Sequence, residues 1–211
     1  MGKKRARIDR LLEIFPLYSE ELGIDLSKPS GRFKWFVASI LFGARISEQI
    51  ASNTYGYFET AGIASAPEKI IQAGWERLVE ILDSGGYVRY DFSTATKLLE
   101  IMASLQSNYG NLENLYRQST DSKDLERRLQ EFKGIGPATT QIFLRELRGR
   151  WNVEPEISKI AGTSATNLEI ELSQFEGERL ARVETALVKL YLRYCKKSKC
   201  SECPMKESCK K

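Results

Sequence analysis

The sequence contains no histidine, and this absence removes several common kinds of catalytic site. Without imidazole there is no Ser-His-Asp triad, no Cys-His pair and no HExxH zinc site. Any proton transfer in catalysis must then be performed by carboxylates, lysine, tyrosine or water. Long apolar runs are also missing, since no stretch of about 18 apolar residues is present to span a bilayer. The first residues, Met1-Gly2-Lys3-Lys4-Arg5, lack the apolar run of a secretory signal.

What the sequence does contain is typical of a folded domain with uneven charge. The chain has 211 residues, 42% hydrophobic and 28% charged, which allows one or two domains with a real core. Residues 1–10 carry five basic side chains and one acidic one, and residues 195–211 carry six lysines and two glutamates. Each end is therefore +4 and the remaining 184 residues are −4. Basic ends suit a polyanion such as DNA, although they can also serve solubility alone.

Apolar residues recur at a spacing close to 3.6 along almost the whole chain, and no alternating strand pattern is convincing. The fold class predicted is all-α, with about ten helices and no internal repeat. The three tryptophans, at positions 35, 75 and 151, are expected to pack inside. The predicted helices span about 8–22, 30–41, 46–58, 67–74, 75–82, 92–105, 112–117, 125–132, 138–147 and 176–194.

A tight turn between two of these helices is the first candidate site. Gly134 and Gly136 flank Ile135, which can enter the core and fix the turn, while the glycines allow positive φ and close approach of another molecule. Pro137 starts the next helix, whose first amides are free to bind an anion. The turn can therefore bind a DNA phosphate through backbone groups. The alternative is an ordinary corner between two helices.

The second candidate site is a cluster of cysteines in the last 17 residues, in a chain with no others. Four crowded thiols indicate a metal centre more than two disulfides, because the body is large enough to fold without cross-links. Both zinc and a [4Fe–4S] cluster accept four cysteines, and the single C-x2-C knuckle favours the cluster. Reduced thiols and the missing signal predict a cytoplasmic protein. The predicted ligands are Cys195, Cys200, Cys203 and Cys209.

Three segments together resemble a known family. Leu129–Thr139, with its Gly-Ile-Gly turn, resembles an L-x-G-[VI]-G-x-x-T hairpin, and Leu41–Glu48 resembles an L-L-S-A-Q-x-T-D segment. Gly85–Tyr87 resembles a third landmark more loosely. With the four-cysteine tail, the chain resembles the endonuclease III and adenine-glycosylase superfamily of helix-hairpin-helix DNA glycosylases. The first two cysteines have four residues between them, where that family usually has six.

The resemblance implies a fold and a domain organisation. Residues 31–136 would form a six-helix barrel that ends in the hairpin. Residues 1–30 and 137–211 would form a second helical domain, with the cluster loop at 195–209. Duplex DNA would bind in the cleft of such a protein, with the target base flipped out. We expect a monomer, with no protein partner and no membrane.

The resemblance also implies the catalytic residues. The strand-cleaving members place a Schiff-base lysine where this chain has Ala138, so a glycosylase without lyase activity, using water, is expected. The family's essential aspartate is matched by Glu154 through its local V-D-x-x-[IL] pattern, and by Glu156 through spacing from the hairpin. Glutamate reaches about 1.5 Å further. A displacement of about 1 Å can cost on the order of 100-fold in rate, so a damage-binding protein without catalysis is the alternative.

Further DNA-binding residues follow from the same resemblance. Arg45 stands where the family often fills the space left by a flipped base, although it could instead form a surface ion pair. Arg89, beside Tyr87 and Tyr90, could bind phosphate or stack on bases, with the tyrosines partly in the core. In the hairpin, the expected DNA-binding residues are Gly134, Ile135, Gly136, Ala138 and Thr139.

Overall fold

The computed structural model describes residues 2–210 of the chain, and the side chains of residues 5–210. Lys3, Lys4 and Lys211, which belong to the basic ends, lie outside the described side chains. Within residues 2–210 there is no β-strand, only one isolated bridge between Arg148 and Trp151, so the predicted all-α class is confirmed. None of the helices in this part of the chain is long and apolar enough to cross a membrane.

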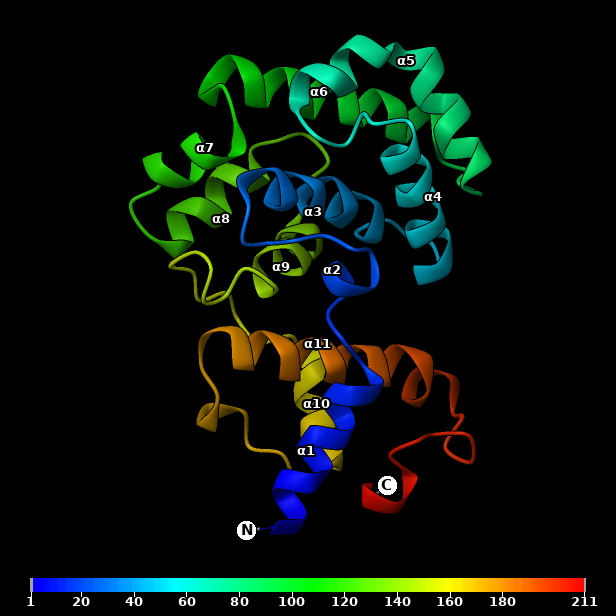
Figure 1. Cartoon of the computed structure of the whole chain (residues 1–211), viewed down its shortest axis with the longest axis vertical. Helices are drawn as coiled ribbons and strands as arrows, with labels where there is room; N and C mark the ends of the chain where they lie inside the picture. Colours follow the sequence, from blue (N-terminus) through cyan, green and yellow to red (C-terminus); the bar gives the residue numbers. More distant parts are fainter. Residues whose placement is uncertain (1, 211) are drawn as a thin grey trace. The chain divides into compact units, whose positions relative to one another are not determined.

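The helices follow one another along the chain, as Figure 1 shows in sequence colours, and the irregular segment 146–158 separates α9 from α10. Three short 3₁₀ turns accompany them: η1 (Leu172–Gln174), η2 (Cys195–Lys197) and η3 (Lys206–Ser208). The α-helices are α1 (Gly2–Ile14), α2 (Tyr18–Glu21), α3 (Pro29–Phe42), α4 (Glu48–Thr60), α5 (Pro67–Ser84), α6 (Asp91–Tyr109), α7 (Leu112–Gln118), α8 (Ser122–Gln130), α9 (Pro137–Arg145), α10 (Lys159–Asn167) and α11 (Gly177–Arg193).

The chain divides into two compact units. The terminal unit consists of Met1–Glu21 and Leu144–Lys211, and the central unit of Leu22–Phe143. The division therefore falls near residues 22 and 143, where the resemblance placed it at 31 and 136. Helix α9 begins in the central unit and its last two residues belong to the terminal unit. The six-helix barrel stays a prediction.

The central unit has an aromatic core. Trp35 is fully buried, and its indole N–H donates to the carbonyl of Phe143 at 3.0 Å. Phe36 meets Phe143 edge to face, with ring centroids 5.2 Å apart, an arrangement favoured by the ring quadrupoles. Helix α5 packs along α6, and α3 packs on α4. The buried large apolar side chains fix where the loops of this unit lie.

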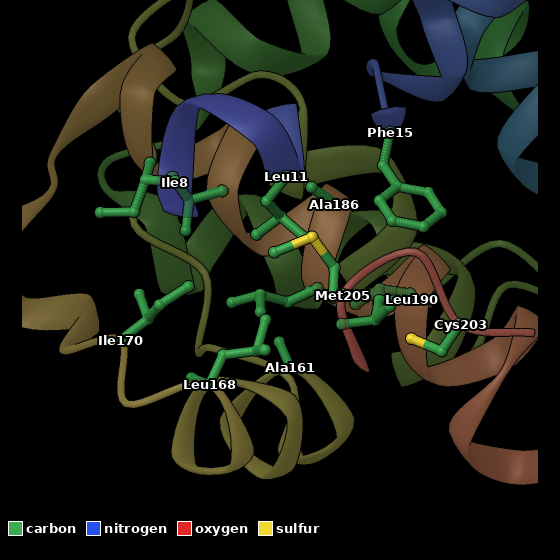
Figure 2. Close-up of a cluster of buried hydrophobic side chains, with 14 residues drawn as sticks. Ile8, Leu11, Phe15, Ala161, Leu168, Ile170, Ala186, Leu190, Cys203 and Met205 are labelled. Carbon is green, nitrogen blue, oxygen red and sulfur yellow. The ribbon is translucent and has the colours of Figure 1, made fainter. Parts of the chain in front are cut away.

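The terminal unit has a core of its own, in which α1 and α10 both pack on α11. Figure 2 shows its side chains, with Leu11 of α1 and Leu190 of α11 in one cluster. The C-terminal tail contributes Met205, only 1% exposed, and Cys203 to the same cluster. The tail is therefore part of this core.

Two local features differ from the helices predicted from the sequence, and one agrees with them. The first predicted helix, about 8–22, is interrupted at Pro16, because proline cannot continue the backbone hydrogen bonding of a helix. Gly74 has φ 73° and ψ 172°, so α5 is two helical segments joined at a kink, as expected. Helix α10 was not predicted from the sequence.

Candidate functional site

The predicted hairpin is present, formed by α8, the turn at residues 131–136, and α9. The Asp121 carboxylate caps α8 by accepting the backbone N–H of Asp124 at 2.8 Å. Ile135 is buried, and its N–H donates to the carbonyl of Phe132 at 2.9 Å. Capping at one end and a buried side chain in the turn together fix the hairpin in one conformation.

The two glycines of the turn play different roles. Gly134 has φ +92°, in the region that favours glycine, whereas Gly136 has no positive φ, so the expectation of positive φ was wrong for it. A Cβ at Gly136 would meet no atom within 4 Å, so the space beside it is open. Gly134 is therefore needed for the turn, and Gly136 leaves room for another molecule to approach.

Several backbone amides at the start of α9 have no acceptor in the described part of the chain. The first bond of this helix runs from the N–H of Thr140 to the carbonyl of Gly136, at 3.0 Å. The N–H groups before it, of Gly134, Gly136, Ala138 and Thr139, donate to no other group within residues 2–210. Such amides, at the positive end of a helix dipole, form an anion site.

A second expected segment, Leu41–Glu48, lies against this hairpin. Gly43 is the C-cap residue of α3, and a Cβ there would overlap the hydroxyl of Thr139 and lie 3.0 Å from its Cβ. Thr139 is buried, so its side chain packs on Gly43 instead of facing outward. The glycine thus allows α3 to approach α9 closely.

The third expected segment reaches the same place. The buried Tyr87 hydroxyl donates to the carbonyl of Leu41 at 2.9 Å, and burial raises the pKa of this phenol. Gly85 packs on α4, since a Cβ there would lie 2.7 Å from the Cβ of Thr54. The three motif segments, far apart in the sequence, therefore meet within the central unit.

Arg45 and Arg89 are both exposed in this unit. Arg45 lies between α3 and α4 and makes no ion pair among the side chains of residues 5–210. The Arg89 guanidinium lies 5.7 Å from the centre of the Tyr90 ring, a cation–π distance. Both cations are thus accessible to an anionic ligand.

Trp75 corrects one expectation. Trp35 and Trp151 are buried as predicted, but Trp75 is 41% exposed. Its ring lies 5.3 Å from the Phe92 ring, and its indole N–H donates to the Thr96 hydroxyl at 3.0 Å. The expectation that all three tryptophans pack inside was therefore wrong for Trp75, whose contacts with Phe92 and Thr96 are made at the surface.

Glu154 and Glu156 lie in the terminal unit, in an irregular loop before α10. Both are exposed, while Val153 and Pro155 between and beside them are buried. The alternation turns both carboxylates to the outside. The fold therefore gives the two glutamates similar surroundings and does not choose between them.

A buried ion pair holds this loop. Arg148 and Glu184 are 3% and 0% exposed at their side chains and pair with each other. Arg148 also donates to the carbonyl of Pro155, and Glu184 accepts the N–H of Ser158 at 2.9 Å. Each partner thus binds one backbone group of the loop, so the pair fixes the segment that carries the two glutamates.

The four cysteines are free thiols in the terminal unit. Cys203 is buried in the core, Cys195 and Cys209 pack against it in part, and Cys200 is exposed. Burial raises the pKa of the Cys203 thiol, and the charges of Cys209 and Cys200 raise it further. The four donors suit an iron–sulfur cluster or zinc by type. However, among the described residues no three cysteine, histidine, aspartate or glutamate side chains are arranged to hold a metal ion.

Comparisons with known proteins find similarity at the level of the fold. Neither a family model nor a curated protein sequence matches the chain. A solved structure does, the crystal structure of the H. pylori 3-methyladenine DNA glycosylase MagIII bound to 1,N6-ethenoadenine. The match has a TM-score of 0.53 at 16% identity, and covers 89% of this chain and 98% of MagIII. The chain therefore shares the fold of a helix-hairpin-helix DNA glycosylase.

Proposed function

We propose that this protein is a base-excision DNA glycosylase that removes a damaged or mismatched base from duplex DNA and acts as a monomer. The observation that carries the proposal is the row of amides at the start of α9 that have no acceptor among the described residues, in a chain with a glycosylase fold. Such amides bind a phosphate of the DNA backbone without reading sequence. The hairpin would therefore position the protein on any duplex, and a separate pocket would recognise the base.

In this proposal the exposed arginines act beside the hairpin. Arg45, on the connection that follows Gly43, would occupy the space left by the flipped base and stack on its neighbours. Arg89, next to Tyr90, would bind a phosphate. Each contact offsets part of the few kcal/mol that unstacking of a base costs.

Glu154 is the proposed catalytic carboxylate, with Glu156 as the second candidate. Cleavage of the glycosidic bond leaves positive charge on the sugar, which a fixed carboxylate stabilises. The bonding electrons leave with the base, a water oxygen adds to the sugar C1′, and the carboxylate takes the proton of that water. The buried pair of Arg148 and Glu184 would hold the carboxylate in place.

Ala138 implies that the reaction stops at base release. A strand-cleaving mechanism needs an amine that traps the sugar carbon, and alanine at this position supplies none. Ala138 is exposed at the start of α9, beside the proposed phosphate site. The product would be an intact strand with an abasic site.

The experiment is a lesion screen with the purified protein. Duplexes would carry 3-methyladenine, 1,N6-ethenoadenine, uracil, hypoxanthine or an oxidised base, since MagIII was solved with 1,N6-ethenoadenine. We expect base release from one of them, seen as strand breaks after hot alkali. Glu154→Gln should abolish release and Glu156→Gln should reduce it less. Strand breaks without alkali would contradict the role given to Ala138.

A damage-binding protein without catalysis is the second candidate, favoured by glutamate in place of the family's aspartate. The longer side chain shifts the carboxylate by about 1.5 Å, enough to reduce the rate on the order of 100-fold or more. Tight binding to a lesion with no release of any base would support this candidate. Release that depends on Glu154 would exclude it.

We further propose that Cys195, Cys200, Cys203 and Cys209 hold a [4Fe–4S] cluster, with zinc as the alternative. The proposal is supported by four free thiols in one short tail, three of which contact the same core. When bound, the cluster would cross-link the tail and would take no part in base release. Brown protein with iron and sulfide in a 1:1 ratio is expected. Colourless protein with one zinc would favour the alternative, and the absence of both metals would contradict the proposal.

A further inference from the structure

Lys97 of α6 lies directly against the hairpin. If Gly134 carried a Cβ, that atom would overlap Cδ of Lys97 and lie 2.9 Å from its Cγ. The aliphatic stem of Lys97 therefore covers the backbone at the one residue of the turn with positive φ. The contact gives Gly134 a second reason to be glycine, in addition to its φ.

The next turn of α6 also meets the hairpin. Glu100 accepts a hydrogen bond from the Lys133 ammonium at 3.2 Å, so one side of α6 follows the turn for at least one helical turn. Lys133 is thereby partly neutralised. Lys97, three residues before Glu100, makes no hydrogen bond or ion pair with any described side chain or backbone group.

The Lys97 side chain is thus half-buried, and its ammonium has no acceptor in the part of the chain that the structure describes. Its burial lowers the pKa of the amine, because a charge removed from water with no partner is disfavoured. An anion beside it would reverse that penalty. The Lys97 stem covers Gly134, and Gly134 belongs to the row of hairpin amides, with Gly136, Ala138 and Thr139, that has no acceptor within residues 2–210.

We infer that the Lys97 ammonium binds the same DNA phosphate as the hairpin amides, as its second ligand. This inference rests on the proposed function, because it needs DNA at the hairpin. The amides would fix the direction of the phosphate and Lys97 would supply the charge that neutral amides lack. A lysine is suited to this because its ammonium acts as a mobile point charge at the end of a fixed stem.

The test compares Lys97→Met with Lys97→Arg and with a control, Lys69→Met, which removes an exposed lysine from α5 of the same unit. Methionine keeps the stem over Gly134 and removes only the charge. Affinity for an undamaged duplex would be measured at several salt concentrations. Loss of one phosphate contact should lower the slope of log K against log salt by about 0.9 and the low-salt affinity roughly 10-fold. Lys97→Arg should retain most of both.

The possible outcomes separate the inference from the proposed function. If the wild-type protein does not bind duplex DNA at low salt, the proposed function fails. If it binds and Lys97→Met has the wild-type slope, only the inference fails. A drop of the same size in Lys69→Met would also overturn it, because the loss would then reflect general charge. As an independent readout, NMR titration of the Lys97 side chain should show a higher pKa when a short duplex is added.

Discussion

The two units of this protein stabilise their candidate site residues in different ways. In the central unit none of the described charged side chains is buried, and the core is aromatic and aliphatic. The buried charged side chains all belong to the terminal unit: Arg145, Glu146, Arg148, Glu184 and Lys189. The hairpin is therefore held by apolar packing, and the glutamate loop by hydrogen-bonded charges.

This difference predicts which substitutions would destabilise each candidate site. Packing is non-directional and roughly proportional to buried area, so the hairpin should tolerate changes that conserve volume. A buried charge is stable only while its partner is present, so the glutamate loop should be sensitive to single charge removals. Glu146 illustrates the second case, since its carboxylate accepts the N–H groups of both Tyr18 and Ser19, at 2.9 and 3.0 Å.

The largest effect is expected from Arg148→Met. It leaves the Glu184 carboxylate buried without its cation, which typically costs about 3–5 kcal/mol of unfolding free energy. Urea unfolding measures this loss. The double variant Arg148→Met/Glu184→Met, which has neither charge, should recover much of the lost unfolding free energy. Arg77→Met is the control, because Arg77 pairs with Glu80 at 2.8 Å on the surface and such pairs contribute roughly 0–1 kcal/mol. If Arg148→Met lost no more unfolding free energy than Arg77→Met, the buried charges would not stabilise the terminal unit in the way described.

The next effect is expected in the central unit, from Leu98→Ala. Leu98 of α6 is fully buried, so truncation should cost about 3 kcal/mol of unfolding free energy through lost burial and a cavity. Leu98→Met nearly conserves volume and should cost less than about 1.5 kcal/mol. The same urea experiment measures both. Equal losses in the two variants would show that this core does not depend on volume.

A smaller effect should separate the two glycines of the hairpin. Gly134→Ala places a side chain at φ +92° and against Lys97, so a loss of about 1–2 kcal/mol is expected. Gly136→Ala has open space and no positive φ, so a change within about 0.5 kcal/mol is expected. Thermal unfolding of the two variants provides the comparison. A larger loss in Gly136→Ala than in Gly134→Ala would contradict the roles assigned to the two glycines.

The smallest effect is a pH dependence in the terminal unit. Burial lowers the pKa of Lys189, whose ammonium also contacts Glu21 at 2.9 Å and lies over the Tyr18 ring. The unfolded chain therefore binds more protons than the native one below the ordinary lysine pKa of 10.5. Stability should accordingly rise as the pH approaches 10.5 and then level off.

Lys189→Met provides the measurement, because it removes the titration of this amine together with its ion pair to Glu21. The difference in unfolding free energy between the wild type and the variant should increase with pH up to about 10.5, the ordinary lysine pKa. A difference that is flat, or that falls with pH, would contradict the lowered pKa. The loss of unfolding free energy caused by Leu98→Ala in the central unit should not depend on pH in this range.

The sequence predicted the helices that have a clear apolar face and clear end signals. Helices α3, α6 and α11 were expected from their spacing, and the hairpin from Gly134, Ile135 and Gly136. These features are local, so a short window of residues contains the necessary information. Pro16 gave an equally local signal that the first helix ends, and the apolar positions on both sides of it obscured that signal.

Helix α10 could not be predicted in this way. Its sequence, KIAGTSATN, contains a glycine and several β-branched or hydroxyl residues of low helix propensity. It forms because Ser158 caps it, accepting the N–H of Ala161 at 3.2 Å, and because Ala161 and Ala165 are buried in the terminal core. Tertiary packing therefore overrides a weak local preference.

The supporting residues of the candidate sites were also missed. Arg148 and Glu184 are 36 residues apart, and nothing in either neighbourhood indicates that both charges are buried together. The fit of Gly43 against Thr139 is likewise a contact between distant segments. Sequence patterns can propose which residues perform a function, whereas the groups that hold them in place emerge only from the folded chain.

The position of Met205 inside the terminal core has a practical consequence for altering this protein. The tail that carries the cysteines is also tied to the body near its end, where the N–H of Lys210 donates to the carbonyl of Asn167 at 2.9 Å. Deleting the tail to test the proposed metal site would also uncover Leu11 and Leu190, and would confound the loss of the four thiols with loss of folding. Replacing the sulfur atoms one at a time, with Met205 kept, separates the two.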